Sequence, residues 1–377
     1  MGAAGSRSVA SAHLHLVAVD IVVAEDDTWR VVELNDQPGG LSIAELPAAP
    51  EASALDAVAT LLVSSAGERP IVLQLPDRFS ITGSPRGGFV RTLRLADANA
   101  AETLGQFNAL SAAIRARGAS ALFSTAADLA APGAARPGAL FRRGTLPVVE
   151  DPSDMLVVND HAVRELCLSK RRSAVVLEEL GFGERQIPTF AGADAEALAA
   201  FRGRHRGEDD LFVAKAERGA RGRQVYLVSG SRAVRDGWLR QMILSGRLML
   251  QPYLRPKVIR GPGGHAYAAD LRLYFVGGRL AGGLVRRAAA AVSLYGTTHR
   301  AAWLPPGGRV LSLASAMSDG WIGTALLEEM ATTLEAMVAA LDDYLARDGA
   351  ALDAAYRSSL STYVDRRVEP CTVACES

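Results

Sequence analysis

Two apolar runs near the start of the chain flank the acidic segment EDDT, a pattern typical of a β-hairpin. A turn centred between Asp26 and Asp27 places Asp20 directly opposite Glu33 on the neighbouring strand. Side chains alternate along a strand, so Glu33 and Asn35 point to the same face. The pattern therefore predicts a hairpin that gathers two carboxylates and one amide oxygen on a single patch.

The middle of the chain alternates between helical and strand patterns. A small α/β unit is predicted over 53–165, with the buried strand PIVLQLP and an amphipathic helix at 101–118. A helical segment that begins near 162 ends at Gly181, and glycine commonly follows the last turn of a helix.

Strands dominate much of the second half. After a helix predicted at 194–202, two strands flank a glycine-rich loop in DDLFVAKAERGARGRQVYLV, and residues 247–287 are mostly strand. A long amphipathic helix is predicted at 323–347. The expected fold class is α/β, in four segments with bounds 1–49, 50–165, 166–350 and 351–377, the last of them a polar tail.

Composition narrows the class of protein. A chain of 377 residues holds two or three domains, and 49% hydrophobic residues are ample for a core. The formal net charge is zero, so neither a nucleic acid nor an acidic membrane is indicated as a partner. Apolar runs shorter than about 18 residues and the lack of a signal-peptide pattern predict no membrane span and no leader. Cys167, Cys371 and Cys375 form no disulfide framework, which favours a reducing, cytoplasmic location.

The paired carboxylates of the first hairpin indicate a cation site. Like charges directly opposite one another are destabilising unless a cation lies between them. Hard oxygen ligands suit Mg²⁺, which takes one or two carboxylates together with substrate phosphates. The alternative interpretation is a solvated hairpin face followed by a Pro-Gly turn.

A lysine and a glycine-rich loop stand in the middle of the chain. Lys215 ends an apolar strand, and backbone N–H groups freed by Gly219 and Gly222 can surround phosphate oxygens. The spacing of a P-loop is missing, and a basic hairpin turn is the alternative. Lys170, beside two arginines on a predicted helix, has the alternative of a solvated basic face.

A hairpin turning at Gly277 and Gly278 brings the two ends of DLRLYFVGGRLAGGLVRR together. Positive charge from Arg286 and Arg287 then meets Asp270, and arginines in such a place can brace a phosphoryl group that develops charge. The alternative is a structural Asp–Arg pair.

In RLMLQPYLRP, a proline breaks the strand ladder and frees backbone groups that can read an adenine edge, with a plain edge strand as the alternative.

Together these segments resemble the ATP-grasp superfamily, whose members hold ATP between two α+β lobes. LSKRRSAVVLEELGFGERQIPTF is similar to the family's Lys-helix-Gly-hydrophobic-Pro-Thr segment, with Lys170 as the first nucleotide lysine. FVAKAERGARGRQVYLV resembles the second lysine and the glycine loop over the phosphates, and MLQPYL resembles the hinge that reads adenine. The resemblance implies that ATP is bound by Lys170, Lys215, Gly219, Gly222, Arg223, Gln251, Pro252, Tyr253, Leu254 and Asp270.

DLRLYFVGGRLAGGLVRR is similar to the Asp-x-Arg hairpin of the glutathione-synthetase-like branch. That resemblance implies that Asp270 lies near the ribose and Arg272 near the phosphates. A later phosphate arginine maps by spacing to Arg287, with Arg286 as the other possibility.

VD followed by ELN and then PG resembles the family's metal strands, in which Asp20, Glu33 and Asn35 would hold two Mg²⁺ ions. In most relatives these strands close the domain after the long helix, whereas here they open the chain. The resemblance therefore implies a circular permutation in which 1–49 complete the ATP-grasp domain of 166–350, and 50–165 is the small preceding domain.

Family members make an acylphosphate from a carboxylate and ATP, and an amine usually attacks it to give an amide. The implied function is an ATP-dependent carboxylate–amine ligase acting on an amino acid, a peptide or a carrier-bound acyl group. Relatives are often dimers, which leaves a homodimer open. The rival interpretations are a phosphotransferase, a thioester-forming enzyme and a non-catalytic nucleotide-binding protein.

Overall fold

The computed structural model describes residues 13–75, 79–82, 89–92, 98–124, 137–142, 155–205, 210–218, 225–261, 264–288 and 309–368. The chain is mixed α/β, as its hydrophobic pattern predicts. Five residues discussed above lie outside the described residues: Gly219, Gly222, Arg223, Cys371 and Cys375.

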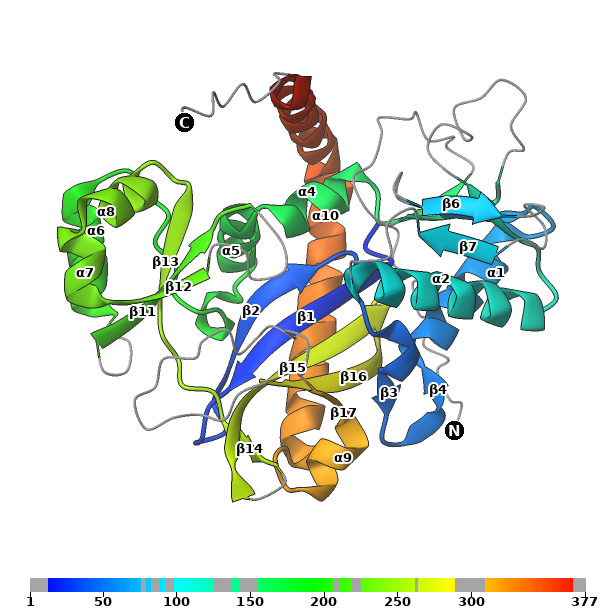
Figure 1. Cartoon of the computed structure of the whole chain (residues 1–377), viewed down its shortest axis with the longest axis horizontal. Helices are drawn as coiled ribbons and strands as arrows, with labels where there is room; N and C mark the ends of the chain where they lie inside the picture. Colours follow the sequence, from blue (N-terminus) through cyan, green and yellow to red (C-terminus); the bar gives the residue numbers. More distant parts are fainter. Residues whose placement is uncertain are drawn as a thin grey trace, which may run out of the picture.

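The two predicted hairpins belong to one sheet, although they stand far apart in the sequence (Figure 1). β1 (Leu16–Val23) pairs antiparallel with β2 (Trp29–Asn35) on one side and with β15 (Ala266–Val276) on the other. β15 pairs in turn with β16 (Arg279–Arg287). The eight-stranded sheet, of order β2-β1-β15-β16-β3-β4, is completed by β3 (Glu45–Leu46), β4 (Ala49–Ser53), β14 (Val258–Arg260) and β17 (Arg309–Ser312).

The first hairpin contains a β-bulge at Val32. Close to the turn its partners are one residue out of step with the predicted register, as in the pair Val23 and Trp29. Val32 is the extra residue of β2, and beyond it Asp20 lies directly opposite Glu33. The predicted carboxylate neighbours are therefore confirmed, whereas the predicted centre of the turn is wrong because a bulge cannot be read from alternation.

Long helices cover one face of the sheet. α10 (Thr324–Val368) and the shorter α4 (His161–Leu168) and α5 (Lys170–Glu179) share a core with every second residue of the strands, including Val19, Leu271 and Leu273. α9 (Leu313–Ser318) joins the same core. In the part of the chain that the structure describes, no helix has the length and apolar character needed to span a membrane.

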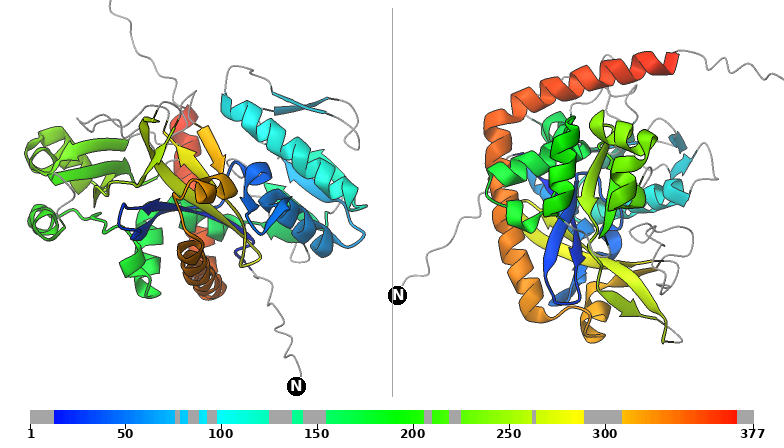
Figure 2. Two further views of the ribbon diagram at one scale, coloured as in Figure 1. Left: turned by 90° about the horizontal axis from the view of Figure 1, so that it is seen from below. Right: turned by 90° about the vertical axis from the view of Figure 1, so that its left-hand side faces the viewer.

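α10 is longer than the sequence pattern predicts. The predicted helix ends at 347 and a polar tail begins at 351, but the structure continues the helix to Val368. Leu352 and Tyr356 are buried, and the Tyr356 ring stacks on His161 of α4 with ring centroids 5.2 Å apart. α10 changes direction along its length as it passes α4 (Figure 2). Contacts with α4 thus sustain a helix that local propensity would allow to end.

The helical segment that ends at Gly181 is two helices rather than one. Ser169 has extended backbone between α4 and α5, and its hydroxyl accepts a hydrogen bond from the N–H of Arg172. Ser169 is therefore the N-cap of α5, and Lys170 is the first residue of that helix.

A three-stranded sheet of order β12-β11-β13 forms a separate small lobe. Its own core includes Phe201, Phe212 and Leu250, and it shares no buried residue with the core beneath α10. The lobe consists of α6 (Ala195–Arg204), β11 (Leu211–Ala216), β12 (Val225–Ser229), α7 (Gly230–Arg235), α8 (Gly237–Leu244) and β13 (Leu248–Pro252). The eight-stranded sheet, which we call the large lobe together with α4, α5 and α10, lies beside it (Figure 1).

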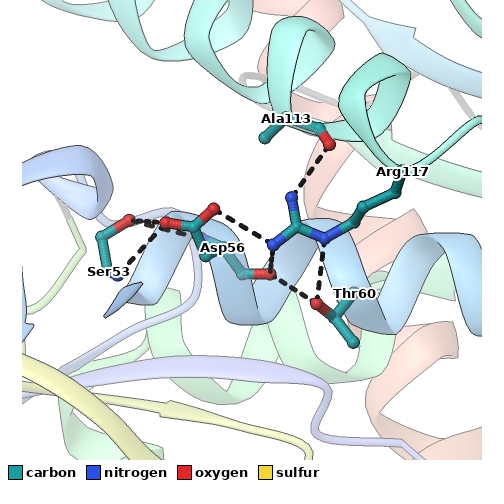
Figure 3. A network of polar contacts seen from close by, with 5 residues as sticks. All are labelled: Ser53, Asp56, Thr60, Ala113 and Arg117. Atoms are coloured by element: carbon teal, nitrogen blue, oxygen red, sulfur yellow. Dashed lines mark hydrogen bonds and ion pairs between the residues drawn. The ribbon is translucent and has the colours of Figure 1, made fainter. Parts of the chain in front are cut away.

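A parallel sheet of order β10-β9-β5-β8 forms the third unit. Its core, shared with α1 and α2, includes Tyr274 and Leu284 of the large-lobe sheet. Arg117 at the end of α2 ties the two helices together by an ion pair with Asp56 of α1, at 3.1 Å (Figure 3). The unit consists of α1 (Ala54–Ala66), β5 (Ile71–Gln74), α2 (Ala98–Ala116), β8 (Ala121–Ser124), β9 (Ala139–Arg142) and β10 (Leu156–Val158).

The residues before β1 are tied to the middle of α10. The backbone N–H groups of His13 and Leu14 both donate to Oδ1 of Asp342, at 2.9 and 2.7 Å. One helical carboxylate thus satisfies two amides that precede a strand placed inside the sheet.

Asp342→Ala should lower the free energy of unfolding by about 1–3 kcal/mol, because it leaves two partly buried amides without their acceptor. Asp343→Ala, at the exposed neighbouring position, should change it by less than about 0.5 kcal/mol. Urea unfolding followed by circular dichroism measures both variants. Equal values for the two would show that the tie contributes no stability.

Candidate active site

Four charged side chains meet on the face of the large-lobe sheet that the long helices leave free. Arg272 of β15 donates from Nε and Nη2 to the two carboxylate oxygens of Asp20, at 2.6 and 2.7 Å. Arg286 of β16 makes the same two-point contact with Asp270, at 2.7 Å for both bonds. Nη2 of Arg286 also lies 3.1 Å from Asp20. We call these four residues the charge network.

The strand register creates this network. Asp20 is the direct partner of Arg272 across β1 and β15, and Asp270 is the direct partner of Arg286 across β15 and β16. Residues two apart on β15 share a face, so both pairs lie on the same side of the sheet. Each acid therefore faces an arginine in the geometry that allows two parallel charge-assisted hydrogen bonds.

Burial and charge act against each other in the network. Burial alone would raise the pKa of Asp20, but the guanidinium groups of Arg272 and Arg286 outweigh it and lower that pKa to about 2. Burial raises the pKa of Asp270, although Arg286 lies against it. At neutral pH, Asp20 is ionised and holds two arginines in place.

Lys215 approaches the same region from the small lobe. Its Nζ donates to the carbonyl oxygen of Val32 at 3.2 Å, and the side chain is buried. Val32 is the bulged residue, so its carbonyl is not committed to a regular strand ladder. Burial lowers the pKa of Lys215 to about 8, with Glu33 acting to raise it and Lys170 acting to lower it. Glu33 and Lys170 are thus close enough to act on the pKa of Lys215.

A small pocket lies where the two lobes meet. Its enclosed volume is about 20 Å³, which is room for about one water molecule. The charged residues of its wall are Glu33, Lys170 and Lys215, and the wall also includes Cys167, Gln186, Ile187, Thr189, Met249 and Gln251. The two lobes are therefore in close contact around this pocket, where Lys215 of the small lobe reaches Val32 of the large lobe.

Arg286 and Arg287 point to opposite faces of β16. Arg286 belongs to the charge network, whereas the guanidinium of Arg287 lies over the ring of Tyr267, 4.3 Å from its centroid. Sequence spacing favours Arg287 as the second arginine of the site. The structure instead places Arg286 beside Arg272, because Arg286 is the residue paired with Asp270.

The three predicted metal ligands differ in their surroundings. Glu33 lines the pocket, while both oxygens of Asp20 are engaged by arginines. Oδ1 of Asn35 accepts a hydrogen bond from the N–H of Gln37 at 3.0 Å, which closes a local turn. Within the described ranges, no group of three or more His, Cys, Asp or Glu side chains is arranged to hold a metal ion. Two neighbouring carboxylates nevertheless fit an ion such as Mg²⁺ that takes most of its ligands from phosphates.

The predicted hinge is more regular than its proline suggests. Gln251 and Pro252 belong to β13, opposite Val213 and Phe212 of β11. The N–H of Tyr253 donates to the carbonyl of Leu211 at 2.9 Å, so this backbone group is bonded rather than free. Leu254 lies in the irregular segment 253–257 that leads to β14.

Sequence reasoning missed two contributors to the region where the lobes meet. The carbonyl of Val32 becomes available only through the bulge. Glu165 of α4 is a buried carboxylate in contact with Arg218, which lies two residues after the end of the Lys215 strand. The signal in the sequence is that Glu165 is an acidic residue that stands among the apolar residues Val163, Leu166 and Cys167, a pattern that indicates a buried carboxylate.

Neither the protein-family models nor the curated protein sequences gave a match to this chain. Several solved structures are similar to it. A putative gamma-glutamylcysteine synthetase from Methylobacillus flagellatus KT shows 14% identity and a TM-score of 0.47, over 88% of this chain and 90% of that one. D-cycloserine synthetase DcsG shows 16% identity and a TM-score of 0.44, over 74% of this chain and 82% of that one.

A RimK domain protein described as ATP-grasp, from Sphaerobacter thermophilus DSM 20745, shows 17% identity and a TM-score of 0.32, over 73% of this chain and 98% of that one. Identities and TM-scores this low do not establish an activity for the present chain. Its function is therefore inferred below from its own side chains.

The wild-type protein should lose about 2 kcal/mol of stability, relative to Asp20→Asn, as the pH falls from 5 towards 2. The native pKa of Asp20 lies below its unfolded value, so its ionisation stabilises the fold above about pH 4, and protonation removes that contribution at lower pH. Urea unfolding of both proteins across this range gives the difference. A difference that stays constant with pH would contradict the low pKa.

Proposed function

We propose that this protein is an ATP-dependent ligase of the ATP-grasp type that joins a carboxylate to an amine. The observation that carries the proposal is the convergence of Lys170, Lys215, Glu33 and the charge network where two separate lobes meet. These residues come from distant parts of the sequence, and each of them stands in a motif that resembles the family. A chance surface cluster does not account for the buried Lys215, or for Arg272 and Arg286, whose side chains are only 11% and 12% exposed.

The proposed nucleotide contacts divide between the lobes. Lys215 and Lys170 bind the α- and β-phosphates as positive charges, and Asp270 lies toward the ribose. Arg272 and Arg286 brace the γ-phosphoryl group as charge spreads over its oxygens. The closed pocket is far smaller than the several hundred Å³ that a ligand of this size occupies. Binding of the phosphates in this pocket therefore requires the residues that line it to move apart.

Glu33 and Asp20, with Asn35, are the residues that would hold Mg²⁺, and the resemblance implies two ions. Bound there, the metal would neutralise phosphate charge. Arginines occupy three of the roughly four lone-pair sites of the Asp20 carboxylate, so an ion bound there would compete with Arg272 or Arg286 and could free an arginine for phosphate. Ligand exchange at Asp20 therefore links the charge network to nucleotide binding.

The reaction we propose has two steps. A carboxylate oxygen of the substrate attacks the γ-phosphorus, the bond to the bridging oxygen breaks, and ADP leaves with that electron pair. The amine then attacks the acylphosphate carbonyl, loses a proton, and displaces phosphate to leave an amide. The chain's contribution is positioning, charge stabilisation and exclusion of water by the closed lobes, so no nucleophilic side chain is required. The unit at 50–165 would contact the carboxylate substrate.

Glu33→Ala should reduce Mg²⁺-dependent ATP consumption about 100-fold or more, since it removes a charged group at the phosphates. Glu68→Ala, at an exposed site in the 50–165 unit, should leave it unchanged. Phosphate release is measured with panels of carboxylates and amines, and thermal unfolding checks that both variants fold. Undiminished turnover in Glu33→Ala would remove the metal assignment. Sustained ADP release without an amine would indicate a phosphotransferase instead.

The affinity for a non-hydrolysable ATP analogue with Mg²⁺ should weaken about tenfold from pH 7 to pH 9, because the ammonium of Lys215 deprotonates through a pKa of about 8. In Lys215→Met, binding should be weak at both pH values and nearly independent of pH. Isothermal titration calorimetry provides the dissociation constants. A steep pH dependence retained in Lys215→Met would assign the titration to another group.

A further inference from the structure

An ionic cluster joins the two lobes next to both proposed nucleotide lysines. Glu165 of α4, in the large lobe, has 0% of its surface exposed. Its Oε1 contacts the guanidinium of Arg218, which follows β11 of the small lobe, and lies 3.4 Å from Nη1 of Arg172 in α5. The buried carboxylate therefore has one arginine partner from each lobe.

Backbone contacts join the lobes at the same place. The N–H of Lys170 donates to the carbonyl of Glu217 at 3.2 Å, and Ser169 forms an isolated antiparallel bridge with Arg218. The hydroxyl of Ser169 also donates to the carboxylate of Glu217. Ser169 immediately precedes Lys170, and Glu217 lies two residues after Lys215. A shift of Ser169 relative to Glu217 therefore changes the positions of the Lys170 and Lys215 side chains relative to each other.

The junction lies at the opposite end of β11 from the hinge. The hinge contact is the bond from Tyr253 N–H to Leu211, at the start of β11, whereas Arg218 follows its end. At the usual rise per residue, Arg218 is about 20 Å from Leu211. A rotation of the small lobe about the hinge therefore produces its larger displacement at Arg218.

Separation of the lobes at this point has an electrostatic cost. Both arginines approach Oε1 of Glu165, and its Oε2 has no hydrogen-bond partner among the described residues. If Arg218 moves away, the Glu165 carboxylate keeps only its longer contact with Arg172. Loss of one partner of a buried charge is strongly unfavourable. The Glu165–Arg218 contact therefore favours the closed arrangement.

We propose that Glu165 and Arg218 form a latch between the lobes that positions Lys170 and Lys215 beside each other in the closed state. The latch is a positioning device and touches no reacting atom. What the two lysines do once positioned rests on the proposed function, but the latch itself is a property of the free protein.

Cys167 provides a reporter within the chain. It lies on α4, is buried, and lines the pocket between the lobes. Burial raises the pKa of its thiol well above the usual value, so in the closed state it reacts slowly with disulfide reagents. Opening of the lobes brings water to the thiol and accelerates its modification.

The experiment uses the full chain with Cys371→Ser and Cys375→Ser, so that Cys167 is the remaining thiol. Arg218→Gln should increase the rate of modification of Cys167 by an aromatic disulfide reagent about tenfold, and Glu165→Gln should do the same. Arg117→Gln is the matched control. It removes another arginine–carboxylate pair, at 3.1 Å from Asp56, within the 50–165 unit (Figure 3), and should leave the rate unchanged.

Unchanged modification rates in both Arg218→Gln and Glu165→Gln would overturn the latch. An increase in Glu165→Gln alone, together with a lower urea midpoint, would also overturn it, because that result reports weaker folding rather than lobe opening. The Arg218 side chain is 38% exposed, so its replacement by Gln removes the ion pair with little effect on the packing of the hydrophobic core.

Kinetics separate positioning from general structural damage. Arg218→Gln should lower kcat about tenfold while the KM for Mg-ATP changes less than about threefold, because nucleotide still enters but the aligned closed state is rarer. Arg218→Lys, which keeps a charge for Glu165, should recover most of kcat. A raised KM with normal kcat would overturn the positioning role. If the wild-type protein consumes no ATP, the proposed function fails, and the thiol measurement still decides the latch.

Discussion

The ion pair between Asp20 and Arg272 is the contact on which the rest of the site depends. It joins a strand from the beginning of the chain to a strand from the later half, and it fixes their register. A slip of one residue would turn every side chain of β1 to the other face, which would bury Asp20 beneath α10 and expose Val19. In the same register, Asp270 and Arg286 lie directly opposite each other on β15 and β16, on the same face of the sheet.

The bulge at Val32 serves both the sheet and the cleft. It restores the register that sets Glu33 opposite Asp20, and it offers a carbonyl to Lys215 of the small lobe. One irregular residue thereby connects the acidic side of the site to its basic side. The contact of Glu165 with Arg218 makes a second connection between the same lobes. Several polar contacts thus join the two lobes near Lys170 and Lys215.

Alternation and charge in the sequence were enough to predict the first hairpin, the facing carboxylates and the Asp-x-Arg hairpin. They also pointed to Lys215 at the end of its strand, whereas Lys170 was singled out only by the resemblance to the ATP-grasp superfamily. The bulge, the choice between Arg286 and Arg287 and the extension of α10 depend on partners distant in sequence, so local pattern could not decide them. Glu165 escaped notice because a single acidic residue in a helix is normally solvated, and its arginine partner becomes visible only when the lobes are assembled.

The position of β1 in the sheet has a consequence for biosynthesis. Its partner β15 begins at Ala266, so the first hairpin leaves the ribosome long before the strand that it needs. At ordinary elongation rates of about 5–20 residues per second, that interval is roughly 10–50 seconds. During this time the nascent hairpin presents an apolar face and an unpaired edge, both of which favour association with other chains. A cell that makes this protein must therefore shield its first fifty residues until the second half of the chain has been synthesised.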